Sequence, residues 1–258
     1  MELKNSTILI TGGSSGIGLE LAGQLIAQQA KAIIITGRNS SRLEQVKKQF
    51  PQVHTFQSDV SDTAAIAQLF IDVTSQFPEL NIIINNAGIM RNLDLLDTDL
   101  SVDEITSEID ISLSGSIKMV QTFLPHLLQR PGAAIVNVSS GLAFIPFPIS
   151  PVYSAAKAGL HAYTRILRLQ LKQTSIKVFE LAPPATETPL IDAFEGMTNP
   201  SQNMGVNKMV KVAIKGILND TYEIKPGVSK ILKLMSRVAP ETVLNFMEKT
   251  LQKAKAKI

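Results

Sequence analysis

The stretch Thr11-Gly12-Gly13-Ser14-Ser15-Gly16-Ile17-Gly18 decides how the rest of this sequence is interpreted. It follows a short β-branched run, Thr7–Thr11, and leads into a segment with helical periodicity. The three glycines at 12, 16 and 18 allow a sharp turn and a close approach to the helix N-terminus, where free N–H groups favour negative charge. Glycine-rich turns also occur without a ligand. Because this one follows a predicted strand and opens a helix, it predicts a dinucleotide pyrophosphate site.

Short apolar runs recur along the chain and alternate with longer stretches of helical period. Their near-continuous apolar character is typical of a parallel sheet that is covered on both faces. Alternating strand and helix implies right-handed crossovers, so we expect an α/β fold: a three-layer, doubly wound, Rossmann-like parallel sheet of six to seven strands. The predicted strands are Thr7–Thr11, Ala32–Thr36, Val53–Gln57, Ile82–Asn85, Ala133–Val138 and Ile176–Leu181, with a further short one near Tyr222–Ile224.

The segments between these strands carry apolar residues at helical spacing. A long series runs from Ile105 to Val120, and another helix is predicted from about Ser154 to Lys172. No Gly/Ser linker divides the chain, so we expect one domain over residues 1–258. It contains a loop excursion at about 186–202 and a helical part over about 205–258, whose last helix is predicted from Val243 to about Lys257.

Composition excludes several classes of function. The 258 residues include no cysteine, and His54, His126 and His161 lack ligand spacing, so we predict no metal site. A net charge of +3 with 5% aromatic residues does not favour nucleic acid as a partner. No segment has the length of a membrane span or a signal sequence, and a cytoplasmic protein is expected.

Three further motifs stand in a recognisable order and spacing. They are Asp59-Val60, Asn85-Asn86-Ala87-Gly88 and Tyr153-x-x-x-Lys157. Together with the Gly-x-x-x-Gly-x-Gly turn, they resemble the short-chain dehydrogenase/reductase family over roughly Asn5 to Leu190. The C-terminal part is similar to the DltE-type branch of uncharacterised oxidoreductases. The resemblance implies a cofactor site made of Thr11, Gly12, Ser14, Ser15, Gly16, Ile17, Gly18, Asp59, Val60, Asn86, Ala87, Gly88, Tyr153, Lys157, Pro183 and Thr188.

The candidate catalytic pair is Tyr153 and Lys157, which share one helix face because they are four residues apart. The unperturbed pKa of a tyrosine is about 10, and a nearby ammonium would lower it. By resemblance, Tyr153 is the general acid/base, and Ser140 orients the substrate oxygen. Ser112 stands where the family carries an asparagine that helps to hold a water beside the lysine, so its part in catalysis is left open.

The cofactor is expected to be NADP(H) rather than NAD(H). The predicted strand Ala32–Thr36 is followed by Gly37 and Arg38, where the family's NAD enzymes carry an aspartate at the glycine position. A guanidinium pairs with a ribose 2′-phosphate, and no carboxylate at this strand end would repel it. Ser14, Asn39 and Arg42 could assist. The alternative, which we favour less, is that Arg38 is an ordinary surface arginine at a helix start.

The substrate is expected to be an apolar ketone or aldehyde, or a secondary alcohol. Met90, Ser140, Leu142, Phe144 and Leu190 are its candidate contacts, although any of the apolar ones could be core. One alternative is a dinucleotide-binding sensor or scaffold without turnover. A dehydratase or epimerase would need further acid-base residues, which we do not identify. The resemblance also implies a homodimer or homotetramer.

Overall fold

The computed structural model describes residues 1–194 and 200–255, and its centre is one seven-stranded parallel sheet. The strand order is β3-β2-β1-β4-β5-β6-β7. This order confirms the predicted doubly wound fold, and every expected strand is present with its ends moved by at most two residues. The strands are β1 (Thr7–Thr11), β2 (Ala32–Gly37), β3 (Val53–Gln57), β4 (Leu80–Asn85), β5 (Ala134–Val138), β6 (Lys177–Leu181) and β7 (Glu223–Ile224).

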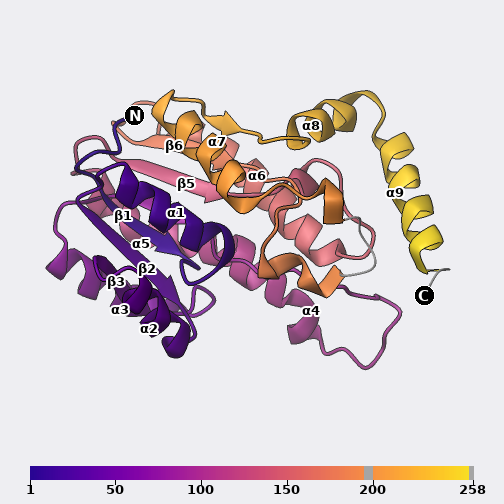
Figure 1. Ribbon diagram of the computed structural model, residues 1–258, viewed down its shortest axis with the longest axis horizontal. Coiled ribbons are helices and arrows are strands. Elements are labelled where there is room, and N and C mark those ends of the chain that lie inside the picture. Colours follow the sequence, from indigo (N-terminus) through magenta and orange to yellow (C-terminus); the bar gives the residue numbers. More distant parts are fainter. Residues whose placement is uncertain (195–199, 256–258) are drawn as a thin grey trace.

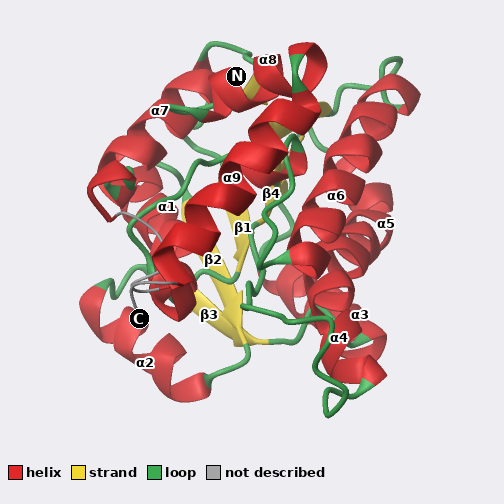
Figure 2. Ribbon diagram, turned by 90° about the vertical axis from the view of Figure 1, so that its right-hand side faces the viewer, coloured by secondary structure: helices red, strands yellow, loops and turns green. Residues whose placement is uncertain are grey.

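Helices cover both faces of the sheet, as Figures 1 and 2 show. On one face lie α1 (Gly16–Ala27), α2 (Ser40–Gln49) and α7 (Val206–Leu218). The other face carries α3 (Thr63–Gln76), α5 (Gly115–Leu127) and α6 (Pro151–Gln170). Each face has its own buried apolar cluster, because alternate residues of every strand point to opposite sides. The two clusters explain why the strand sequences are apolar throughout.

Two helices differ from the prediction in an informative way. The series from Ile105 to Val120 is interrupted: α4 (Val102–Ile109) and α5 are joined by a π-helical turn, Asp110–Ser114. Such a wide turn shifts the side chains that follow it and is often found at functional sites. Helix α6 starts at Pro151, before the predicted Ser154, because proline fits the first position of a helix.

The C-terminal part is helical, as expected, and two of its helices lie at one end of the sheet. They are α8 (Ser229–Val238) and α9 (Pro240–Lys255), and Figure 2 shows α9 crossing in front of the strand ends. Residues 256–258, which include the predicted end at Lys257, lie outside the described part. So do residues 195–199 of the predicted excursion, which otherwise contains short 3₁₀ turns at Pro189–Phe194 and Pro200–Gln202. Among the described residues, no helix combines the length and apolarity that crossing a bilayer requires.

The sheet order reverses beside β1, which pairs with β2 on one side and β4 on the other. A crevice forms at such a point, outside the carboxyl ends of the strands. The packing of α1 beside this crevice depends on Gly18, because a Cβ added there would lie 2.4 Å from the carbonyl oxygen of Gly12. The helix can approach β1 this closely only because that residue has no side chain.

We therefore expect Gly18→Ala to destabilise the fold by about 1–3 kcal/mol, the usual cost of overpacking. Gly23→Ala in the same helix is the matched control, because its Cβ would meet Phe50 at an ordinary 3.5 Å. It should leave stability unchanged or raise it slightly, since alanine is the better helix former. Thermal unfolding of both variants measures the difference. Equal melting temperatures for Gly18→Ala and the parent would contradict this account of the packing.

Candidate active site

One large cavity, of about 990 Å³, opens at the carboxyl ends of the strands. Its walls come from the turn between β1 and α1, the segments that follow β2 to β6, and helices α8 and α9. Of the predicted cofactor residues, those that line it are Gly12, Ser14, Ser15, Gly16, Ile17, Arg38, Asp59, Val60, Asn86, Ala87, Gly88, Tyr153, Lys157, Pro183 and Thr188. The fold thus collects residues that are up to 176 positions apart, Gly12 and Thr188, around one space.

The turn before α1 has the properties of an anion site. Ser15 is the N-cap residue of α1, yet its side chain makes no capping hydrogen bond to the helix. The first-turn N–H groups therefore remain available to a ligand on the cavity side. Gly12 and Gly16 have φ of +65° and +52°, a conformation that side chains disfavour. The chain also passes close to Thr188 here, since a Cβ on Gly16 would lie 3.2 Å from the Thr188 Cβ.

Thr11 and Gly18, which we predicted to contact the cofactor, do not line the cavity. The Thr11 hydroxyl instead accepts hydrogen bonds from the backbone N–H groups of Asn86 (3.0 Å) and Ala87 (3.1 Å). In return, the Asn86 side-chain amide donates to the carbonyl oxygens of Thr11 and Gly12. These bonds join the turns after β1 and β4. Thr11 therefore holds the glycine-rich turn, Gly12–Gly18, in place without lining the cavity.

Arg38 lies at the cavity wall with Asn39 and Arg42, as the 2′-phosphate prediction requires. Its surroundings differ from our expectation, because the Asp59 carboxylate lies 3.9 Å from its Nη1. The prediction rested on the residues that follow β2, whereas Asp59 follows β3, the neighbouring strand. A carboxylate is therefore present beside the guanidinium, which is 59% exposed.

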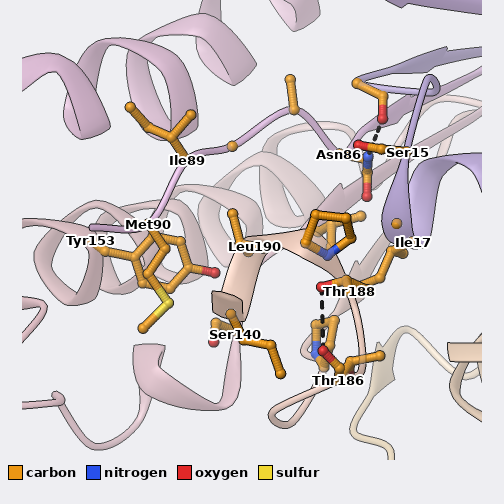
Figure 3. Close-up of a pocket in the computed structure, with 18 of the residues that line it drawn as sticks. Ser15, Ile17, Asn86, Ile89, Met90, Ser140, Tyr153, Thr186, Thr188 and Leu190 are labelled. Atoms are coloured by element: carbon orange, nitrogen blue, oxygen red, sulfur yellow. Dashed lines mark hydrogen bonds between the residues drawn. The ribbon is translucent and has the colours of Figure 1, made fainter. Parts of the chain in front are cut away.

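The candidate catalytic side chains Ser140, Tyr153 and Lys157 lie together at one wall of the cavity. Tyr153 is 5% exposed, and its hydroxyl faces the side chain of Ser140, whose influence lowers the Tyr153 pKa. Lys157 is buried beside it, with Nζ 5.5 Å from the centre of the Tyr153 ring and donating to the carbonyl oxygen of Val138 at 2.8 Å. Figure 3 shows the Tyr153 hydroxyl pointing into the cavity, near Met90, Ser140 and Leu190.

Burial shifts both titratable groups of this pair. The pKa of Tyr153 is raised to about 12. Desolvation is the main cause and the charge of Glu108 acts in the same direction, whereas the interaction with Ser140 lowers the pKa. Desolvation also lowers the pKa of Lys157 to about 8. In the protein alone, Tyr153 therefore keeps its proton at neutral pH and is arranged as a proton donor.

Ser112 lies just behind this wall, in the π-helical turn. It is fully buried and does not line the cavity, and its hydroxyl has no hydrogen-bond partner among the described residues. A Cβ added to Gly88 would lie 3.2 Å from the Ser112 Oγ and 3.5 Å from the Lys157 Nζ. The absent side chain of Gly88 therefore leaves the hydroxyl and the ammonium close to a common space.

Most of the expected substrate residues lie at the cavity wall. Met90, Ser140, Leu142 and Leu190 line the cavity, but Phe144 does not. The ring of Phe144 packs edge-on against His161 instead, with centroids 5.1 Å apart, because the 3₁₀ turn Gly141–Ala143 rotates the chain after Ser140. Phe144, which we expected at the substrate wall, therefore packs outside the cavity.

Three lining residues come from the C-terminal helices and were not predicted from the sequence. Val228 and Leu232 approach from the start of α8, and Met247 comes from α9. Leu251 of α9 also packs with Ile149 and Phe194 beside the cavity. The only signal in the sequence was the amphipathic character of these helices, which does not tell which element their apolar faces meet.

A second polar cluster lies beneath Ser140. The fully buried Glu180 accepts a hydrogen bond from the Ser139 hydroxyl (2.5 Å) and contacts the His161 Nδ1 (2.8 Å). Ligand atoms of Glu180, His161 and Glu223 come within 4.8 Å of one another, a grouping that the sequence spacing of the histidines did not predict. Lys233 and Lys225 pair with Glu223, so this carboxylate already has cationic partners.

Comparison with known proteins agrees with the motifs. Residues 6–199 match the family model described as short chain dehydrogenase. The chain is 44% identical over 192 residues to the uncharacterized oxidoreductase DltE of Bacillus subtilis (strain 168), which covers 74% of this chain and 75% of that protein. It is also 32% identical over 201 residues to an uncharacterized oxidoreductase of Staphylococcus aureus (strain MW2), covering 77% and 84% of the two chains. The predicted likeness to the DltE-type branch is thus confirmed.

Solved structures support the fold. A short chain dehydrogenase from Burkholderia cenocepacia J2315 in complex with NADP has a TM-score of 0.82 and 21% identity, and the match covers 96% of this chain and 99% of that one. A short chain dehydrogenase/reductase from Burkholderia phymatum in complex with NAD also has a TM-score of 0.82, with 20% identity and 92% and 95% coverage. With the family model matching most of its length, this chain belongs to the short-chain dehydrogenase/reductase family of oxidoreductases.

Proposed function

We propose that this protein is an NADP(H)-dependent oxidoreductase that interconverts an apolar ketone or aldehyde and the corresponding alcohol. The observation that carries the proposal is the convergence of Ser140, Tyr153 and Lys157 on one cavity wall, opposite the glycine-rich turn. The hydroxyl, phenol and ammonium come from two elements, the end of β5 and helix α6. This set has the groups that proton transfer to a carbonyl oxygen requires.

The residues of the cavity fit a nicotinamide dinucleotide. The uncapped start of α1, with Gly12 and Gly16, suits the pyrophosphate, and Asp59 and Val60, which resemble the family's adenine-pocket pair, line the same cavity. Lys157 lies beside Tyr153 and Pro183 lies next to the turn after Ser140, whereas Thr188 lies against Gly16. When bound there, the cofactor supplies a hydride to the carbonyl carbon or accepts one from the alcohol.

The chain's own residues manage the proton. Ser140 donates its hydroxyl hydrogen to the substrate oxygen and holds it within reach of the Tyr153 hydroxyl. Tyr153 gives its proton to that oxygen in reduction and recovers it from the side of Lys157. Ser112 and Lys157 border the space next to Gly88, where a water would connect the ammonium to a proton source.

Apolar side chains around the reacting end set the substrate class. Met90, Leu142, Leu190, Leu232 and Met247 all line the cavity, and none of them carries a charge. A charged substrate group would lose its hydration here without gaining a partner. We therefore assign the enzyme to uncharged, apolar carbonyl compounds or secondary alcohols.

NADP(H) is proposed over NAD(H) because Arg38 meets the cavity with Arg42 and Asn39 close by. The ion pair with Asp59 is long, at 3.9 Å, and the guanidinium is largely exposed. Such a pair contributes little and leaves the remaining N–H donors free for a phosphate.

A binding protein without turnover is the competing function. It would need the glycine-rich turn but would have no use for the pairing of Ser140 with Tyr153 or for the buried ammonium of Lys157. The cost of burying that ammonium favours a catalytic role.

We expect Tyr153→Phe to lower kcat for NADPH-dependent reduction by about 10²–10⁴-fold, because it removes the proton donor. The Kd for NADPH should stay within about twofold to threefold, since the cradle is untouched. The assay follows NADPH absorbance with a panel of apolar ketones and aldehydes. Tyr163→Phe is the control, since Tyr163 lies on the same helix and does not line the cavity. Unchanged turnover in Tyr153→Phe would contradict the mechanism, and no turnover in the parent would favour the binding protein.

Arg38→Gln tests the cofactor preference. The Kd for NADPH should rise about tenfold or more, the usual worth of a charge-assisted hydrogen bond to phosphate, while the Kd for NADH should change little. Lys47→Gln removes an equal charge from the exposed side of α2 and should leave both constants unchanged. Fluorescence titration of the nicotinamide measures all of them. Tighter binding of NADH than NADPH by the parent protein would overturn the assignment.

A further inference from the structure

Glu108 is a buried carboxyl group that the mechanism above does not use. It lies in the last turn of α4 and is 0% exposed, which raises its pKa. A carboxyl group inside a protein is tolerated only where hydrogen bonds or opposite charge replace its lost hydration. Its partners therefore indicate what it holds in place.

The carboxyl of Glu108 faces two other segments. Its Oε1 accepts a hydrogen bond from the backbone N–H of Arg91 at 2.6 Å, and the Arg91 Nε lies 3.9 Å from the same oxygen. The backbone N–H of Tyr153, in the first turn of α6, faces this carboxyl and acts to lower its pKa. Its Oε2 has no hydrogen-bond partner among the described residues. Glu108 thus connects the segment that follows Met90 with the helix that carries Tyr153.

Helix α6 has no side-chain cap of its own. Ser150 occupies the N-cap position, but its hydroxyl donates to the carbonyl oxygen of Arg91 at 2.8 Å instead of accepting from the helix. Pro151 has no N–H, so the N–H of Tyr153 is one of the few first-turn donors that need a partner. The Glu108 carboxylate faces this end of the helix from α4, where a negative charge is favoured, and it is also connected to Ser150 through Arg91.

The charge of Glu108 also acts on the Tyr153 side chain. It opposes formation of the phenolate and contributes to the raised pKa of that hydroxyl, after desolvation. Arg91, from the loop after β4, is the cation that acts on Glu108, and Tyr153 is the titratable group that faces it from α6. On α4 itself, Glu104 is exposed and bonded to Ser101.

We propose that Glu108 is a positioning residue for Tyr153: its buried carboxylate faces the start of the catalytic helix and holds Arg91, whose carbonyl oxygen accepts the hydrogen bond of Ser150 at the N-cap of that helix. The same hydrogen bond to Arg91 fixes the segment that follows Met90. These contacts depend only on the fold, whereas their consequence for turnover rests on the proposed function.

The test uses Glu108→Gln, which keeps the shape and an acceptor oxygen but removes the charge. We expect the kcat for reduction at pH 7 to fall about tenfold through misplacement of Tyr153, with the Kd for NADPH unchanged. Asp103→Asn removes an equal charge from the exposed face of α4 and should change neither quantity. Glu108→Asp keeps the charge and should recover part of the lost kcat. A kcat equal to that of the parent in both Glu108 variants would overturn the proposal.

A second readout requires no turnover. The chain has three tyrosines and no tryptophan, so ¹³C-labelled tyrosine gives three ring signals, of which Tyr153→Phe identifies one. Removing the negative charge stabilises the phenolate, so in Glu108→Gln the Tyr153 signal should titrate about one pH unit lower than in the parent. A lower titration in a protein without turnover would support the role of Glu108 while refuting the proposed function. If the titration of Tyr153 does not move, even with a lower melting temperature, Glu108 is only a structural residue and the proposal is overturned.

If Glu108→Gln does not fold, both measurements are made on Glu108→Asp. A kcat at least about twofold below the parent would support the proposal, and a kcat and a titration equal to the parent's would overturn it.

Discussion

The structure depends on the close approach of the turn after β1 to the turn after β4. The Thr11 hydroxyl accepts hydrogen bonds from the backbone N–H groups of Asn86 and Ala87, and the Asn86 side chain donates to the carbonyl oxygens of Thr11 and Gly12. Gly12 permits this contact, because a Cβ there would lie 2.9 Å from the Ala87 Cα. The first turn forms the anion cradle at the start of α1, and the second leads into Gly88 and Met90 on the reacting side. A single set of bonds therefore fixes the distance between cofactor cradle and catalytic wall.

Burial determines the chemistry on that wall. Tyr153 and Lys157 are both removed from water, which disfavours the charged form of each, so the pKa of Tyr153 rises and that of Lys157 falls. Tyr153 then holds its proton until a substrate oxygen accepts it, and the ammonium of Lys157 remains close enough to restore it. Glu108 adds a third buried group whose charge acts in the same sense as desolvation on Tyr153. The arrangement suits reduction of a carbonyl group.

Local patterns explain which parts were predictable. The strands, the glycine-rich turn and the Tyr153–Lys157 pair could be predicted because each depends on residues within a few positions of one another. Asp59 beside Arg38, Phe144 against His161 and Met247 in the cavity depend on contacts between distant segments, which no local pattern encodes. Glu108 looked like an ordinary polar residue of an amphipathic helix, and only its complete burial distinguishes it.

The central claim is that hydride passes between the nicotinamide and an apolar carbonyl at this wall. It is tested most directly by mixing the enzyme with NADPH deuterated at the transferring position of nicotinamide C4 and an apolar ketone, and analysing the product by mass spectrometry. The account predicts one deuterium on the carbinol carbon of the alcohol. Deuterium retained in the cofactor with the ketone unchanged, across the substrate panel, would contradict it.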